Sequence, residues 1–219
     1  GKSAAVRSFQ MLSTKSAGSW GARGGQRRGM ASAGAEEIED KGKRAGVEFY
    51  QFSFVDLFGV QRSKLVPAAR VRSIAESGAG FAGFAAHLDM TPADGDLLGI
   101  PDPNSFAVLP WNPRVAWVAC DLFLNGEELA HAPRNVLRNV LRQVKTKLKA
   151  HLKTGVECEF FLLAPPPRAP PGAPPPPPPA PRIADPCDTQ LKSCYDAQAL
   201  MRRFELIASM MEHMHALGW

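Results

Sequence analysis

Apolar and aromatic residues gather in three short segments that predict β-strands. Residues 45–56 are dense in Phe, Tyr and Val, and residues 60–66 follow after the turn at residues 57–59, so the two segments predict a hairpin. A further strand is predicted for residues 114–124, and the tight-turn pair Asn125-Gly126 follows it directly. The pattern therefore indicates a β-rich unit that begins near residue 45.

Two helices are predicted by residue spacing, and a long segment without periodicity lies between them. Residues 67–77 predict a short helix that ends near Gly78, whereas residues 78–113 are interrupted by Gly and Pro and predict a loop. Residues 133–150 predict a longer helix that Pro133 opens. Its apolar positions recur with the 3.6-residue helical period, and they are Val136, Leu137, Val140, Leu141, Val144 and Leu148.

The opposite face of this longer helix is basic. Its charged residues are Arg134, Arg138, Arg142, Lys145 and Lys149. Basic amphipathic helices occur at membrane surfaces and in calmodulin targets. More often the charged face is the solvated outer side of a helix whose apolar side is packed, and we expect that arrangement here.

A last helix is predicted from Asp196, a favourable N-cap residue, to Gly218, which stands where a C-terminal cap would. His213 and His215 are two residues apart and so diverge by about 200° on a helix, which makes them a poor chelating pair. The apolar face of the helix carries Leu200, Phe204, Ile207, Met211 and Met214.

Glu157 and Glu159 carry the clearest chemical meaning in the chain. They lie in the β-rich run of residues 153–163, and side chains two apart in a strand point to the same face. Two carboxylates on one buried face repel each other unless a cation neutralises them, and Mg²⁺ and Mn²⁺ prefer oxygen ligands. The pair therefore predicts a divalent-metal site. The alternative is an edge strand whose acids are simply solvated.

Proline dominates residues 164–182, where neither a helix nor a central strand is expected because proline lacks the N–H and fixes φ. The segment predicts an exposed polyproline-II insertion. It is either a ligand for an SH3 or WW domain or a tolerated surface insertion.

The net charge of +5 comes from the start of the chain. Residues 1–35 hold six of the 26 basic residues and no acid, so 20 basic residues remain against 21 acids. The basic balance is therefore no argument for nucleic-acid binding. A leader rich in Ser, Ala, Gly and Arg resembles a mitochondrial or plastid transit peptide. We expect residues 1–44 to be a disordered leader of this kind; the alternatives are an extension of a cytoplasmic protein or mistranslated sequence.

Neither membrane insertion nor a disulfide scaffold is expected. No run of 18 apolar residues is present. The four cysteines form no C-x-x-C motif and no zinc-like spacing. Cys120 and Cys158 lie in apolar strand segments and are predicted to be buried thiols in a reducing compartment.

Several further stretches occur in a characteristic order along residues 45–219. They are FVDLFGVQRSKLVP at 54–67, GAGFAGFAA at 78–86, LDMTP at 88–92, IPDP at 100–103, LPW at 109–111, KTGVECEFFL at 153–162, CYDAQALMRRF at 194–204 and LGW at 217–219. Together they resemble the N-terminal portion of a glutamine synthetase, and most closely the type III branch beside the γ-glutamylmethylamide synthetases.

The resemblance implies an α+β fold with two parts. A β-grasp-like N-terminal domain, residues 45–130, would precede the start of a catalytic domain, residues 131–219, that is built on a curved antiparallel sheet. In the family a Glu-x-Glu strand opens that sheet, and its two carboxylates help to bind two divalent ions. The resemblance therefore assigns Glu157 and Glu159 to metal binding.

The implied reaction is an ATP-dependent ligation. The γ-phosphoryl group of ATP passes to the side-chain carboxylate of glutamate, and ammonia or a small alkylamine attacks the resulting γ-glutamyl phosphate. Mg²⁺ or Mn²⁺ would neutralise charge on the phosphoryl group and hold glutamate. The resemblance also implies a homo-oligomeric ring in which the loop of residues 78–94 completes a neighbouring active site.

The chain departs from the family in that loop. Many members read Phe-Asp-Gly-Ser there, with an acid that helps to bind ammonium, whereas this chain reads Phe81-Ala82-Gly83-Phe84. Losing the carboxylate removes an attraction for ammonium and leaves a more apolar pocket, which leaves room for methylamine or another alkylamine beside ammonia. Asp89 and Asp94 are the acids that stand nearby in sequence.

The sequence ends at Trp219, before the further metal ligands, glutamate clamp and ATP arginines that the family carries. The 219 residues alone are therefore expected to be catalytically inactive. One alternative function is an assembly or interaction subunit that joins complete subunits. Another is a pseudoenzyme of the family, such as a lens or signalling protein.

Overall fold

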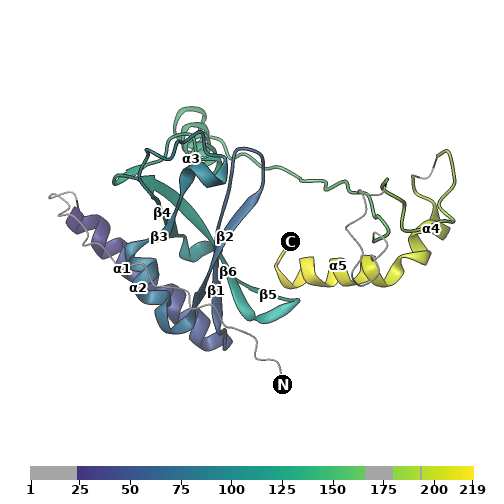
Figure 1. The fold of residues 1–219 in the computed structure, drawn as a ribbon, viewed down its shortest axis with the longest axis horizontal. Helices are drawn as coiled ribbons and strands as arrows, with labels where there is room; N and C mark the ends of the chain where they lie inside the picture. Colours follow the sequence, from purple (N-terminus) through teal and green to yellow (C-terminus); the bar gives the residue numbers. More distant parts are fainter. Residues whose placement is uncertain (1–23, 166–179, 193) are drawn as a thin grey trace, which may run out of the picture.

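The structure, a computed structural model, describes residues 24–165, 180–192 and 194–219. Seven strands occur in these residues: β1 (Phe49–Val55), β2 (Gln61–Pro67), β3 (Ala79–Phe81), β4 (Leu97–Pro101), β5 (Ala107–Leu109), β6 (Asn112–Leu124) and β7 (Glu127–Glu128). They form one mixed sheet around β6, to which β1 pairs in parallel and β4, β5 and β7 pair antiparallel. Strands β2 and β3 are its two edges (Figure 1).

The predicted hairpin and the predicted third strand are confirmed. Strands β1 and β2 pair antiparallel along their full lengths. The strand expected at residues 114–124 is β6, which begins two residues earlier. Asn125 and Gly126 have φ values of 48° and 89°, the positive values that a type I′ turn requires, and they lead into β7.

The expectation of a loop over residues 78–113 is wrong. This part of the chain holds β3, β4 and β5 and the 3₁₀ helices η2 (Gly83–Ala86) and η3 (Pro103–Ser105). Each element is three to five residues long, so none is long enough to show a period. Gly99 interrupts β4 for a packing reason, because a Cβ there would lie 2.9 Å from Cε2 of Phe81 on the neighbouring strand.

The expectation of a disordered leader is wrong for residues 24–44, which lie in helix α1 (Gly24–Ala45). Ala35 and Ile38 are 1% and 0% exposed, and Gly42 lies against Tyr50, so a stripe with helical spacing packs into the core. Small residues make up most of this stripe, which is why it does not stand out as an apolar pattern. Residues 1–23 of the expected transit peptide lie outside the described residues.

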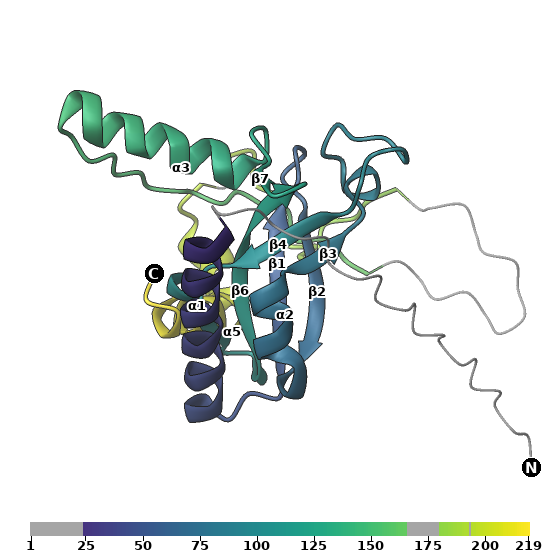
Figure 2. The ribbon, with the colours of Figure 1, turned by 90° about the vertical axis from the view of Figure 1, so that its left-hand side faces the viewer.

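The short helix predicted for residues 67–77 is confirmed as the 3₁₀ turn η1 (Ala68–Arg70) and helix α2 (Val71–Ser77). Gly78 ends it with φ 87°, and its N–H donates to the carbonyl oxygen of Ile74 at 2.8 Å. Helices α1 and α2 lie side by side on one face of the sheet (Figure 2).

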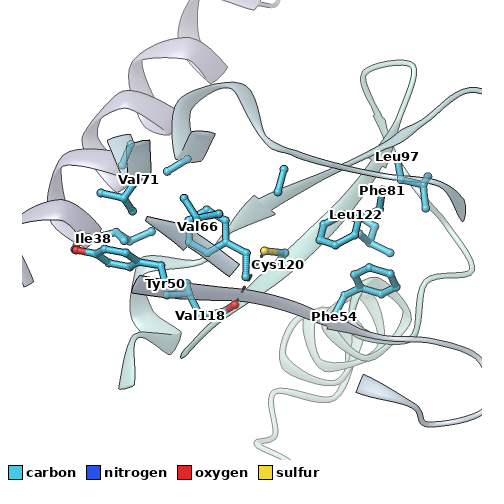
Figure 3. Close-up of a cluster of buried hydrophobic side chains, with 14 of the residues drawn as sticks. Ile38, Tyr50, Phe54, Val66, Val71, Phe81, Leu97, Val118, Cys120 and Leu122 are labelled. Atoms are coloured by element: carbon cyan, nitrogen blue, oxygen red, sulfur yellow. Dashed lines mark hydrogen bonds between the residues drawn. The ribbon is translucent and has the colours of Figure 1, made fainter. Parts of the chain in front are cut away.

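The core fills the space between these two helices and the sheet (Figure 3). Tyr50, Phe52 and Phe54 are buried at alternate positions of β1, as a strand with one core face requires. The ring of Phe54 meets Phe81 edge to face, with 4.9 Å between ring centroids, so the core joins β1 to β3. Cys120 is buried on β6, as predicted. The fold class is α+β, as the resemblance implied.

The helix predicted for residues 133–150 is formed by α3 (Pro133–Gln143) and a π-helical turn, η4 (Val144–Leu148). The expected packing of its apolar stripe is wrong, because most of the stripe is exposed, from 39% at Leu141 to 71% at Leu148. The side chain of Asn135 is what anchors α3, since its Nδ2 donates to the carbonyl oxygens of Leu122 and Leu129 at 2.9 and 3.0 Å. From there α3 projects away from the sheet (Figure 2).

The strand predicted for residues 153–163 is not formed. Residues 149–162 have no regular secondary structure; the chain turns back beside α3 after η4 and then runs on as an extended segment (Figures 1 and 2). A strand needs a neighbouring backbone, and the described residues offer this segment one isolated bridge, between Leu163 and Ile183.

The predicted C-terminal helix is formed in two parts, α4 (Ala197–Arg202) and α5 (Phe204–Ala216). Asp196 is its N-cap, as predicted, because its carboxylate accepts from the backbone N–H of Gln198 at 2.9 Å. None of the helices in the described part of the chain combines the length and the apolar character that a membrane span requires.

Candidate functional site

The loop expected to contact the amine begins at the end of β3. Phe81 is the last residue of that strand, Ala82 is exposed, and Gly83 opens η2. Glycine is required at position 83 by close packing, because a Cβ there would overlap Sδ of Met90 and lie 3.1 Å from Cδ1 of Leu97. The structure therefore places the three predicted residues in one tight connection.

Beyond η2 the chain turns twice through the left-handed region, at His87 with φ 47° and at Asp89 with φ 54°. Asp89 is exposed and makes no side-chain hydrogen bond to any described residue. Asp94 instead closes its own turn, because Oδ2 accepts from the backbone N–H and the hydroxyl of Thr91 at 2.7 and 3.0 Å. These bonds hold the pKa of the Asp94 carboxyl below its usual value. Of the two nearby acids, Asp89 is the one whose carboxylate is available to a ligand.

Lys64 is a residue of this site that sequence reasoning missed. It stands on the edge strand β2, and its ammonium lies over the ring of Phe81, 5.3 Å from the ring centroid. No described carboxylate pairs with it. Lys64 lies opposite Phe52 in the β1–β2 register, so its side chain is on the same face of the sheet as Phe52. A cation over the Phe81 ring disfavours a second cation, such as ammonium, next to that ring.

The loop is held against the β1–β2 turn. The backbone N–H of Leu57 donates to the carbonyl oxygen of His87 at 3.3 Å, and the ring of Phe58 meets the His87 ring edge on at 5.1 Å. On the other side, Nε2 of His131 lies 2.8 Å from the carbonyl oxygen of Leu88. Because the loop is anchored from two elements, its exposed residues keep a fixed position relative to the sheet.

Glu157 and Glu159 are both exposed in the extended segment, and so is Cys158, which corrects its expected burial. Their apolar neighbours are exposed as well, including Val156 at 84%. Water screens the repulsion between two such carboxylates, so this conformation needs no cation. The physical basis of the predicted metal site, a buried pair, is thus absent from this segment as it stands.

The two carboxylates fit Mg²⁺ or Mn²⁺ in chemistry but not in number. Both ions prefer oxygen ligands, and Mg²⁺ takes about six in octahedral geometry. Across residues 24–165, 180–192 and 194–219, no group of three or more His, Cys, Asp and Glu side chains gathers to hold an ion. The metal-binding role of Glu157 and Glu159 stays a prediction, and neither residue lies in the loop around Phe81.

Known proteins with similar sequences establish the family. A glutamine synthetase of Rhizobium meliloti (strain 1021) is 41% identical over 177 residues, which are 81% of this chain. The chain belongs to the glutamine synthetase family. A glutamate–methylamine ligase of Methyloversatilis universalis is 34% identical over 178 residues, 80% of the chain. No family model matches the chain.

A solved structure extends the comparison to the fold and the branch. The GmaS/ADP complex in its conformation 1 matches 83% of this chain with a TM-score of 0.72 and 49% sequence identity. The predicted family and its branch beside the methylamide-forming enzymes are thus confirmed. The chain spans only 38–39% of the length of these relatives.

Proposed function

We propose that these residues form part of an ATP-dependent ligase that joins a small amine to the side-chain carboxylate of glutamate through γ-glutamyl phosphate. The observation that carries the proposal is the likeness to the GmaS/ADP complex over 83% of the chain. The Methyloversatilis relative is a glutamate–methylamine ligase by name, and the Rhizobium relative is a glutamine synthetase. We propose the activity for a protein of the relatives' length that contains these residues.

The proposal includes a division of the chain into two parts. We assign the sheet with α1 and α2 to the β-grasp-like N-terminal domain, and residues 131–219 to the start of the catalytic domain. In that second part the apolar stripe of α3, residues 156–163 and much of α5 are exposed. Apolar surface of this extent is usually covered by other protein. We propose that further catalytic-domain structure covers it and pairs with residues 153–163 as a strand.

Glu157 and Glu159 are the proposed metal ligands of that strand. Once residues 153–163 have a ladder on each side, both carboxylates project to one face, where a divalent ion offsets their repulsion. The ion supplies charge neutralisation for phosphoryl transfer when it is bound. The remaining oxygen ligands would come from water or other residues of the complete protein.

The proposed amine is a small alkylamine in preference to ammonia. Ala82 stands where an acid would attract ammonium, and the ammonium of Lys64 lies over the adjacent Phe81 ring at 5.3 Å. The alkyl group of an alkylamine gains contact with apolar side chains that ammonia cannot make. Asp89 is the remaining carboxylate of the loop and is the proposed group that orients the amine.

The test is an assay of phosphate release by the complete protein with ATP, Mg²⁺ and glutamate. Ammonia and methylamine are supplied in parallel, and a reaction without amine is the blank. Amine-dependent phosphate release, with the amide product found by mass spectrometry, supports the proposal. Absence of release with both amines and with both Mg²⁺ and Mn²⁺ overturns it.

A non-catalytic assembly subunit is the second candidate, and the exposed apolar surfaces of α3 and α5 favour it. Such a chain would join complete subunits rather than react. Size-exclusion chromatography of the 219-residue chain, alone and mixed with a complete relative, separates the two ideas. Co-elution in the ring supports the assembly subunit, and separate elution as a monomer contradicts it.

An organellar location remains part of the proposal, with a revised boundary. The buried residues Ala35 and Ile38 make α1 part of the folded domain, so a cleavable leader would end before residue 24. Import of a fusion of residues 1–23 to a reporter into isolated mitochondria or plastids supports this boundary. Retention of that fusion in the cytoplasm supports the cytoplasmic alternative.

A further inference from the structure

The segment around α3 carries a local surplus of positive charge. Residues 129–156 contain seven Lys or Arg residues and no Asp or Glu. The chain beyond residue 35 has 20 basic and 21 acidic residues, so this excess is local. A local surplus of cations on a nearly neutral protein creates a field that attracts anions.

The backbone folds these cations around a hollow. The π-helical turn η4 ends at Lys149, whose φ of 52° reverses the chain, and the N–H of Ala150 donates back to the carbonyl oxygen of Val144 at 3.5 Å. The returning segment lies beside α3 and leaves a hollow of about 470 Å³. The side chains that line it include Arg138, Leu141, Arg142, Lys145, His151 and Leu152.

Two of the three permanent cations at the hollow have no carboxylate partner among the described residues. Arg138 is neutralised by ion pairs to Asp121 and Glu128. Arg142 donates to the neutral side chain of Asn139 at 3.0 Å and keeps its full charge. Lys145 makes no ion pair to a described residue. The hollow thus presents two uncompensated positive charges, one helical turn apart, and its lining also includes the apolar side chains of Leu141 and Leu152.

Helix stability is a simpler explanation for these cations, because cations near a helix C-terminus interact favourably with the helix dipole. Lys147 is an example of a cation that helix stability explains. It lies in the same turn, donates to Gln143 at 3.2 Å and does not line the hollow. The dipole accounts for cations at the helix end, but not for their convergence on one hollow. Arg142 and Lys145 lie on the basic side of the helix, whereas Leu141 belongs both to the apolar stripe and to the lining of the hollow.

We propose that this hollow binds a small molecule that carries two or three linked phosphates. Arg142 and Lys145 are three residues apart, about 4.5 Å along the helix, so linked phosphates can contact both whereas a single carboxylate reaches one. Guanidinium and ammonium groups are the usual partners of phosphate oxygens. The volume lies in the range of small-ligand sites, about 300–1,000 Å³. The site is separate from Glu157, Glu159 and the Phe81 loop and does not depend on the proposed ligase activity.

Inorganic triphosphate is the probe, titrated by calorimetry into the purified 219-residue chain at low salt. We expect saturable binding at one site, weakened at least about tenfold in Arg142→Gln and in Lys145→Gln. Lys147→Gln is the matched control with the same charge change in the same turn, and its affinity should fall less than about threefold. Lys145→Arg keeps the charge and should retain binding.

Parallel titrations with ATP and AMP identify the source of the phosphates. If ATP binds more tightly than triphosphate and AMP binds weakly, the ligand is a nucleotide; if triphosphate and ATP bind equally, the linked phosphates alone are recognised. Equal losses in Lys145→Gln and Lys147→Gln mean diffuse charge attraction and overturn the site. Absence of binding to the unmodified chain also overturns it. Circular dichroism of each variant confirms that α3 is intact.

Discussion

The guanidinium of Arg62 lies against the carboxylate of Asp56, with both Nε and Nη2 at 2.8 Å from Oδ2. The other carboxylate oxygen accepts from the backbone N–H groups of Phe58 and Val60, each at 2.9 Å. The side chain of Asp56 is fully buried. One carboxylate thus closes the β1–β2 turn, and the same turn holds the candidate amine loop through the bond from Leu57 to His87.

Replacing Asp56 should therefore loosen both the turn and the loop beside it. Asp56→Asn keeps the shape but loses the charge that two N–H groups and a guanidinium surround, so we expect the melting temperature to fall by at least about 4 °C. Asp96→Asn, at an exposed acid directly before β4, is the control and should leave it unchanged. Thermal unfolding followed by circular dichroism measures both. Equal melting temperatures for the two variants would contradict the role of Asp56.

The same carboxylate predicts a pH dependence. Burial raises the pKa of Asp56, but the N–H of Val60, the guanidinium of Arg62 and the N–H of Phe58 together lower it further, so the net pKa lies below its usual value. A carboxyl whose pKa is depressed by folding stabilises the fold above its unfolded pKa, about 3.9. That contribution is lost as the pH falls from about 4 through the folded pKa. Denaturant unfolding from pH 6 to pH 2 should show a weaker acid dependence in Asp56→Asn than in the unmodified protein.

Helix α1 offers a pair of glycines with opposite expected effects. At Gly42 an added Cβ would overlap the hydroxyl of the buried Tyr50 and lie 2.9 Å from Cγ2 of Val47. At Gly34 the nearest atom is Cγ of Pro103 at 3.6 Å, an ordinary contact. We expect Gly42→Ala to destabilise by about 1–3 kcal/mol, because a well-packed core does not accept the methyl group.

Gly34→Ala is the matched control for that prediction. It adds the same methyl group to the same helix and should stabilise by up to about 1 kcal/mol through helix propensity. Denaturant unfolding of both variants gives the two free energies. If both changes stabilise, α1 is not docked on Tyr50 as described.

Thiol reactivity tests the buried strand β6. Burial raises the pKa of the Cys120 thiol to about 12, with the N–H of Ser53 and the nearby Arg134 acting weakly in the opposite direction. The thiolate is the reactive form, so Cys120 should not react with a thiol reagent at pH 8 in the folded chain. Cys158, Cys187 and Cys194 are exposed and should react within minutes. Titration of all four cysteines before unfolding would contradict the burial of β6.

The proposed amine preference rests on Ala82 and is tested by restoring an acid. In the complete protein, Ala82→Asp should shift the ratio of kcat/KM for ammonia to that for methylamine at least about tenfold toward ammonia, because a carboxylate attracts ammonium and removes apolar surface that favours the methyl group. Ala85→Asp, an exposed acid on η2 of the same loop, is the control and should leave the ratio unchanged. A ratio that moves equally in both variants would show a general charge effect rather than a role for position 82.

Much of the sheet could be predicted from the sequence, and the reasons for the failures are physical. Strands β1, β2 and β6 are long enough to show alternation, whereas β3, β4 and β5 are too short and contain or adjoin Gly and Pro. Helix α1 packs through Ala35, Ile38 and Gly42, a stripe of mostly small residues that hydrophobic periodicity does not detect.

The candidate site shows the same limits. The motif locates the loop around Ala82, but it does not locate Lys64, because the contact of Lys64 with Phe81 joins two strands that are neighbours neither in sequence nor in the order of the sheet. Residues 153–163 do alternate as a strand would, yet alternation does not supply the neighbouring backbone that a strand requires. The described residues contain no such neighbour beyond the bridge at Leu163.

Metal binding by Glu157 and Glu159 in the complete protein tests the central claim most directly. Titration with Mn²⁺, followed by electron paramagnetic resonance, reports bound ions without any need for turnover. We expect Glu157→Gln and Glu159→Gln each to weaken Mn²⁺ binding at least about tenfold, while the exposed control Glu127→Gln binds as the unmodified protein does. Unchanged Mn²⁺ affinity in both Glu157→Gln and Glu159→Gln would contradict the assignment of this pair as metal ligands.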